Sequence, residues 1–290
     1  MYHKHQLPLP TASRAIAEIL LVWAIVIGLL WTLWLNPNFL SWERVIWGVP
    51  LISTTALFIV LPLMVLKLTG RDLGQYGIIL GELRYSVETG FTALAVLGPI
   101  SGTMFPFLIF MGWTPTDWMG GLLLALGYGV AIPLTAYAIR STPMVSIHAT
   151  PTSHLIIFFL FLGVAAVIAA VAHSSSDIVT RVIFYLFFVG LGEELLFRGY
   201  IQSHLNHALG KTFSFMGVKY GLGMFIAALL FGIAHLLSPI NPGHWGWGLW
   251  TFICGLAFGY IREKNGGFVA SAIVHGVLLS VPVLISGYLM

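Results

Sequence analysis

The feature that most constrains this chain is a succession of apolar stretches long enough to cross a lipid bilayer. A transmembrane helix needs about 20 apolar residues, because each residue rises only about 1.5 Å along the axis. The sequence is 58% hydrophobic and 8% charged, whereas soluble domains are about 25% charged. We therefore predict an all-α polytopic membrane protein with about nine spans, or eight if the short seventh one does not cross. The predicted spans are 15–35, 45–66, 89–112, 119–139, 155–172, 179–201, 222–237, 246–262 and 267–289.

The basic residues support this count of spans. With the N-terminus in the cytoplasm, eleven of the thirteen Lys and Arg residues fall on the cytoplasmic side, and only Arg44 and Arg181 fall outside. The positive-inside rule describes this separation. The sequence thus predicts an integral protein of the plasma membrane with a cytoplasmic N-terminus. The eleven residues are Lys4, Arg14, Lys67, Arg71, Arg84, Arg140, Arg198, Lys211, Lys219, Arg262 and Lys264.

The chain shows no low-complexity tract or internal repeat, so we expect residues 1–290 to form one polytopic domain. Its net charge of +3 follows from loops that face anionic lipid, so the lipid bilayer, and not nucleic acid, is the expected partner. The connection 68–88 is predicted to lie along the membrane interface as a short amphipathic helix. His204 and His207 are interpreted as solvated surface residues rather than as a metal site.

Ionisable groups inside the predicted spans are the candidates for chemistry. Each costs roughly 2.5–3.5 kcal/mol in a bilayer, so such groups persist mainly where they are paired or line a cavity. The sixth span contains Glu193 and Glu194, with Arg198 shortly after them, and two later spans contain His235 and His275. On a helix Glu194 and Arg198 are i and i+4 and can pair, whereas Glu193 points about 100° away. We therefore predict a structural Glu194–Arg198 pair and a Glu193 that faces a cavity.

One carboxylate and two imidazoles around a water molecule can hydrolyse a peptide in two ways. In the first, Glu193 takes a proton from a water held by His235, and His275 donates a hydrogen bond to the developing oxyanion. In the second, the same three residues bind zinc, which acidifies the water. Helix geometry places Glu193 and His275 roughly 12 Å, and His235 roughly 20 Å, from the cytoplasmic ends of their spans. We therefore expect the cavity to be reached from the cytoplasmic half.

Other intramembrane protease chemistries fit the sequence poorly. A rhomboid-like serine site needs Gly-x-Ser-Gly, and the stretch from Pro99 to Gly102 lacks the first glycine. The stretch from Gly190 to Glu193 is similar to the Gly-x-Gly-Asp of membrane aspartyl proteases, but Asp177 lies at a span boundary and no second intramembrane aspartate exists. The zinc motif His-Glu-x-x-His is absent. The glutamate and histidine set remains.

Three segments occur in the chain in the order Glu193-Glu194-x-x-x-Arg198, Phe231-x-x-x-His235 and His275. They resemble the three motifs of the CPBP family, which comprises the CAAX prenyl endopeptidases and bacteriocin-processing intramembrane proteases. The resemblance covers about 183–280, which we expect to be the catalytic core. It implies a glutamic intramembrane protease acting on a membrane-anchored protein or peptide, such as a prenylated CAAX-type protein or a peptide precursor. It also implies that no cofactor is needed, with zinc as the alternative. The implied catalytic residues are Glu193, Glu194, His235 and His275, supported by Arg198 and Phe231.

One position departs from the family pattern. The family has an asparagine four residues after the last histidine, also assigned to the oxyanion hole, and this chain has Leu279 there. Loss of one oxyanion donor typically costs about 10²–10³ in rate, and the neighbouring Ser280 lies about 100° around the helix. Two other function classes therefore stay open: a non-catalytic membrane binding or immunity protein, and a proton-coupled transporter, which would also place Glu and His at mid-membrane.

Overall fold

The computed structural model describes residues 11–80, 82–146, 150–238 and 243–286. Every predicted span overlaps a helix in this part of the chain, although the span 45–66 also includes the break between α2 and α3 at residues 48–50. Five helical segments are long and apolar enough to cross a membrane, and shorter apolar helices accompany them. The predicted all-α membrane fold is thus confirmed. The five segments are α1 (Ala12–Leu35), the continuous α3, η1 and α4 (Leu51–Thr55, Ala56–Val60, Leu61–Leu68), α5 (Leu83–Met111), α6 (Trp118–Ile139) and α7 (Thr152–His173).

The remaining elements form the centre of the bundle and its edges. One long helix contains two stretches of wider π-helical turns, and a two-stranded antiparallel hairpin follows it. The long helix consists of α8 (Asp177–Phe184), η2 (Tyr185–Gly190), α9 (Leu191–Glu194), η3 (Leu195–Gln202) and α10 (Ser203–Leu209). The others are α2 (Pro37–Trp47), β1 (Phe213–Phe215), β2 (Val218–Tyr220), α11 (Leu222–Leu236), α12 (Trp245–Asn265) and α13 (Val269–Ser286).

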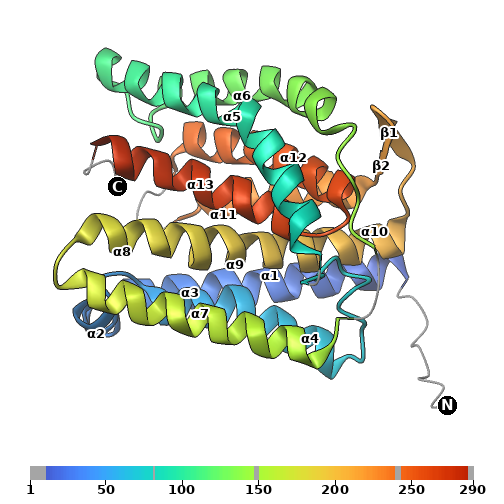
Figure 1. Ribbon diagram of the computed structural model, residues 1–290, viewed down its shortest axis with the longest axis horizontal. Coiled ribbons are helices and arrows are strands. Elements are labelled where there is room, and N and C mark those ends of the chain that lie inside the picture. The colour runs from blue at the N-terminus through green and yellow to red at the C-terminus, as the bar shows by residue number, and fades with distance from the viewer. Residues whose placement is uncertain (1–10, 81, 147–149, 239–242, 287–290) are drawn as a thin grey trace.

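The long helix α8–α10 lies between two groups of helices (Figure 1). On one side are α1, α3, α4 and α7, and on the other are α11, α12 and α13, which α5 and α6 cover. Gly190 on η2 and Gly276 on α13 allow these two elements to touch backbone to backbone, because a Cβ added at Gly190 would lie 2.5 Å from the Cα of Gly276. Small residues are the usual means of such close approach in membranes. This contact brings His275 beside the two glutamates.

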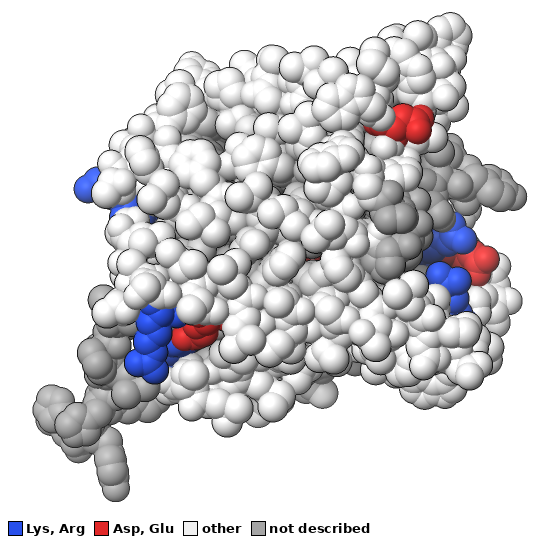
Figure 2. Space-filling model, turned by 180° about the vertical axis from the view of Figure 1, so that it is seen from behind, with Lys and Arg blue, Asp and Glu red and all other residues white. Residues whose placement is uncertain are grey.

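The charged side chains on the surface of the bundle are concentrated at its two ends. Figure 2 shows a broad white band between the coloured residues on the face that it presents. We call the end where α1 begins and α12 ends the basic end. We call the opposite end, where α1 ends and α8 begins, the outer-charge end; it carries Arg44 and Arg181. The described basic residues at or near the basic end are Arg14, Lys67, Arg71, Arg84, Arg140, Lys211, Lys219, Arg262 and Lys264.

The expectation of an amphipathic helix within 68–88 is wrong. Residues 71–80 form turns, and α5 begins only at Leu83. The Asp72 carboxylate accepts the backbone N–H of Gly74 at 2.8 Å, a side-chain turn that competes with helix formation. Gly77 has a φ of +71°, a value that glycine adopts without strain.

The expectation that His204 is a solvated surface residue is also wrong, because its side chain is fully buried. The Tyr76 hydroxyl lies 2.7 Å from His204 Nδ1. Burial raises the pKa of Tyr76 to about 12, so the hydroxyl keeps its proton and can donate it. His207 Nε2 lies 3.0 Å from the carbonyl oxygen of Gln75. The two histidines thus contact the 71–80 turns, a partner too distant in sequence for local reasoning to find.

Candidate active site

One imidazole lies between two carboxylates where α9 contacts α13. The Nδ1 atom of His275 is 3.0 Å from Oε1 of Glu194, and its Nε2 atom is 3.8 Å from Oε2 of Glu193. An ionised carboxylate can only accept a hydrogen bond, so Nδ1 donates to Glu194. Nε2 faces Glu193 at a distance too long for a hydrogen bond. The structure therefore gives the two adjacent glutamates different contacts with the same ring.

Glu194 also contacts Arg198, at the i,i+4 spacing from which the sequence predicted a pair. The Arg198 Nη1 and Glu194 Oε1 atoms are 3.1 Å apart, and both side chains are fully buried. Arg198 Nη2 donates to the carbonyl oxygen of Gly255 on α12 at 3.1 Å, and its guanidinium lies 4.8 Å from the ring centre of Phe231 on α11. Arg198 thus links three helices directly behind the site.

His235 contributes a second imidazole from α11. Its Nδ1 atom is 2.9 Å from the carbonyl oxygen of Phe231. Because a carbonyl oxygen only accepts, Nδ1 donates here and Nε2 is the atom left for water or substrate. The Phe231 ring contacts both histidines, with ring centres 4.6 Å from His235 and 5.7 Å from His275. Phe231 therefore sets the spacing between the two imidazoles.

Glu193, His235 and His275 all line one cavity of about 900 Å³. Most of its wall is apolar or aromatic, and neither Glu194 nor Arg198 contributes to it. The cavity extends from these three residues toward the outer-charge end, where Arg44 and Thr114 lie on its rim. Such a mainly apolar cavity with a few convergent polar groups is the usual form of a binding site.

A hydrogen-bonded network fills the bundle on the other side of the site, toward the basic end. Gln202 Nε2 and Asn206 Nδ2 donate to Oε1 of Glu263 at 2.6 and 2.7 Å, and Lys211 Nζ lies 2.5 Å from its Oε2. We call these four residues the polar seal. The expectation of a cavity open at the end rich in basic residues is therefore wrong. Counting residues along a helix gives depth, but it does not show which interhelical spaces are filled.

Two aromatic residues of α12 that the sequence analysis missed hold the histidine rings. Phe258 stacks on His275 with ring centres 4.8 Å apart, and Trp247 meets the edge of His235 at 5.2 Å. An aromatic residue in an apolar span looks the same in sequence whether it packs against lipid or against a functional ring. The polar residues Gln202 and Glu263 are easier to recognise in the sequence as candidates for a buried polar network, because both follow directly after the end of a predicted apolar span.

The residues of the site do not fit the zinc alternative in this geometry. Among the described residues, no group of three His, Cys, Asp or Glu side chains is arranged to hold a metal ion. Glu193 and His275 approach each other, but His235 does not complete a ligand set with them.

The position of the unusual Leu279 is also defined. It lines the cavity one helical turn beyond His275. The Ser280 hydroxyl donates to the carbonyl oxygen of Gly276 at 2.7 Å, so it is occupied within its own helix. Leu279 thus places an apolar side chain where the family pattern has a hydrogen-bond donor.

A family model matches the part of the chain that contains this site. Residues 174–280 match the model described as type II CAAX prenyl endopeptidase Rce1-like. This stretch contains both glutamates, both histidines, Arg198 and Phe231, and the match confirms the resemblance to the CPBP and CAAX proteases. No curated protein and no solved structure matches the chain significantly. Over residues 174–280 the chain therefore matches the family described as Rce1-like, type II CAAX prenyl endopeptidase.

Proposed function

We propose that this protein is a glutamate-dependent intramembrane endopeptidase in which Glu193 is the general base. The observation that carries the proposal is the Oε2 atom of Glu193, which is buried at the cavity and has no hydrogen-bond partner among the described residues. Buried polar atoms are nearly always hydrogen-bonded in folded proteins. The contact of Glu193 Oε2 with His275 Nε2, at 3.8 Å, is too long for a hydrogen bond. This carboxylate oxygen is therefore well placed to accept a proton from a bound water.

The reaction follows from the contacts of the three cavity residues. Glu193 takes a proton from a water that also donates to His235 Nε2, and the water oxygen attacks the peptide carbonyl carbon. His275, as an imidazolium stabilised by the Glu194 carboxylate, donates from Nε2 to the oxyanion of the tetrahedral intermediate. The carbon–nitrogen bond then breaks while Glu193 passes its proton to the leaving nitrogen.

The apolar wall of the cavity fits a substrate that the bilayer delivers. We propose a membrane-anchored protein or peptide, such as a prenylated CAAX-type protein or a peptide precursor, cleaved by a plasma-membrane enzyme whose N-terminus is cytoplasmic. In this scheme the protein side chains supply both the base and the oxyanion donor, so no metal cofactor takes part.

Cleavage of a peptide panel in the presence of a chelator tests this proposal. The purified protein in lipid vesicles is incubated with membrane-anchored and lipidated peptides, and the products are identified by mass spectrometry. We expect cleavage at one bond and the same rate after treatment with EDTA or 1,10-phenanthroline. Loss of cleavage on chelation, restored by added zinc, would replace the scheme by metal-assisted hydrolysis. Peptide binding without cleavage would favour the non-catalytic membrane binding protein that Leu279 keeps open.

Restoring the family's asparagine should raise the rate. We expect Leu279→Asn to increase kcat by up to about 10²-fold, because a side-chain amide one turn beyond His275 would add an oxyanion donor to the cavity. Leu279→Met is the matched control, since it keeps an apolar side chain of similar volume and should leave kcat near the wild-type value. An unchanged kcat in a folded Leu279→Asn variant would show that another group already supplies this hydrogen bond.

A further inference from the structure

The cavity has its deep end at the catalytic residues and its rim at the outer-charge end. On the long helix, the lining residues stop at Phe197, on α12 they stop at Phe258, and on α13 they begin at His275. No lining residue comes from the parts of these three helices nearer the basic end. The two lining residues that are exposed, Arg44 and Thr114, both lie in or beside connections at the outer-charge end.

The opposite route is closed by buried side chains. Arg198, Gln202 and Glu263 are all less than 5% exposed, and they bond to the backbone or side chains of neighbouring helices. Gln202 donates to the carbonyl oxygen of Gly259 on α12 at 3.1 Å in addition to its bond to Glu263. Opening this region would break several buried hydrogen bonds at once and leave their buried donors and acceptors without partners.

The charges give the orientation of the two ends. Most of the described Lys and Arg residues lie at the basic end, and Arg44 and Arg181 lie at the other. In membrane proteins the cytoplasmic loops are enriched in Lys and Arg relative to the loops on the translocated side. The basic end therefore faces the cytoplasm, and the rim of the cavity faces the other side of the membrane.

From these observations we infer that the catalytic cavity opens to the non-cytoplasmic solution, so that its substrate is a membrane-anchored peptide whose cleavage site has been translocated across the bilayer. The part of this inference that concerns the substrate rests on the proposed protease function. The side from which the cavity is reached is a property of the fold and does not depend on that function. Of the two proposed substrate classes, this direction of access favours a peptide precursor with a translocated cleavage site over a prenylated CAAX-type protein whose scissile bond stays in the cytosol.

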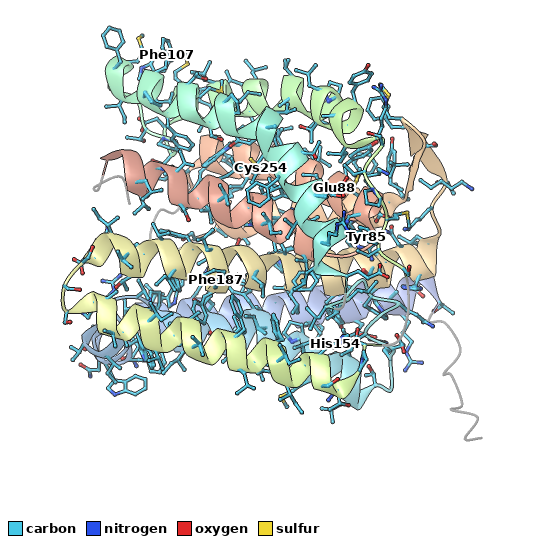
Figure 3. All side chains as sticks on the ribbon, viewed as in Figure 1. Tyr85, Glu88, Phe107, His154, Phe187 and Cys254 are labelled. Atoms are coloured by element: carbon cyan, nitrogen blue, oxygen red, sulfur yellow. The ribbon has the colours of Figure 1, made fainter. Side chains whose placement is uncertain are left out.

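Thiol labelling measures the side of access without relying on catalysis. Single cysteines are introduced at the rim (Thr114→Cys), inside the cavity (Ser238→Cys) and on β1 at the basic end (Ser214→Cys). All three are made in a Cys254→Ser background, because the one natural cysteine, Cys254 on α12 (Figure 3), lines the same cavity. Intact cells and lysed cells are treated with a small, membrane-impermeant methanethiosulfonate.

We expect Thr114→Cys and Ser238→Cys to react in intact cells to the level reached after lysis, and Ser214→Cys to react only after lysis. The reverse pattern would overturn the orientation. Reaction of Thr114→Cys from outside together with reaction of Ser238→Cys only after lysis would show that the cavity opens to the cytoplasm. Thr114 on the rim and Ser214 on β1 are both exposed and lie at opposite ends of the bundle. If one variant fails to fold, the other still reports the orientation.

Sided delivery of a peptide separates this inference from the proposed function. In sealed vesicles of known protein orientation, an impermeant peptide that the detergent-solubilised protein cleaves is added to one side only. Cleavage from the side where Thr114→Cys reacts supports the inference. Cleavage only from the other side would overturn it while leaving the protease function intact, whereas outward labelling without any cleavage would reject the protease function alone.

Discussion

Replacing Glu193 by glutamine should reduce the cleavage rate by about 10²–10⁴-fold, the usual contribution of a general base. Glutamine keeps the size of the side chain and its place in the cavity wall, but it cannot take a proton from water. We therefore expect kcat and kcat/KM to fall together, because the lost interaction belongs to the transition state. Initial rates in lipid vesicles, at peptide concentrations above and below KM, measure both constants.

The matched control for this substitution is Glu88→Gln. Glu88, labelled near the start of α5 in Figure 3, is exposed and is not part of the cavity wall. This variant should cleave at the wild-type rate, so that any loss in Glu193→Gln cannot come from the change of net charge. Wild-type activity in Glu193→Gln would assign the base to one of the two histidines.

Replacing Arg198 by leucine should destabilise the protein by about 3–5 kcal/mol, because it leaves the fully buried Glu194 carboxylate without its cationic partner. Adding Glu194→Gln should restore much of this stability, since the remaining side chain is then neutral. Reversible unfolding in mixed detergent measures the free energy of each variant. A double variant no more stable than Arg198→Leu alone would mean that the bond from Arg198 to Gly255, and not the ion pair, supplies the stability.

The exposed Arg84 provides the control for this second experiment. Arg84→Leu removes the same charge from the start of α5, where surface substitutions usually change stability by less than about 0.5 kcal/mol. A comparable loss in Arg84→Leu would show that the charge change itself, through its effect on membrane orientation or detergent binding, explains the result.

The helices could be predicted from the sequence because the requirement for apolar length is a local one. Each predicted span contains its own intrahelical hydrogen bonds, so its existence does not depend on its neighbours. The 71–80 turns and the continuation of the long helix to Leu209 could not be predicted in this way. Both depend on contacts between distant segments, such as Tyr76 with His204.

The residues of the candidate site were recognisable for a similar reason, since ionisable side chains are rare in apolar spans. The contact of Glu194 with Arg198 follows from spacing on one helix. Which atom of His275 faces which glutamate depends on the close approach of Gly190 and Gly276, and on the stacking of Phe258. Such contacts between helices have no periodic signal in the sequence.

With the cavity open to the non-cytoplasmic solution, as inferred above, the polar seal also determines how the membrane voltage is distributed across this protein. A water-accessible cavity carries the potential of the solution at its rim down to its deep end, so most of the voltage falls across the packed layer that contains Gln202 and Glu263. A charge that crosses the whole field changes its energy by about 2.3 kcal/mol per 100 mV. A proton that reaches Glu193 through the cavity crosses little of that field, and the same packed layer keeps the protein from becoming a pathway for ions through the bilayer.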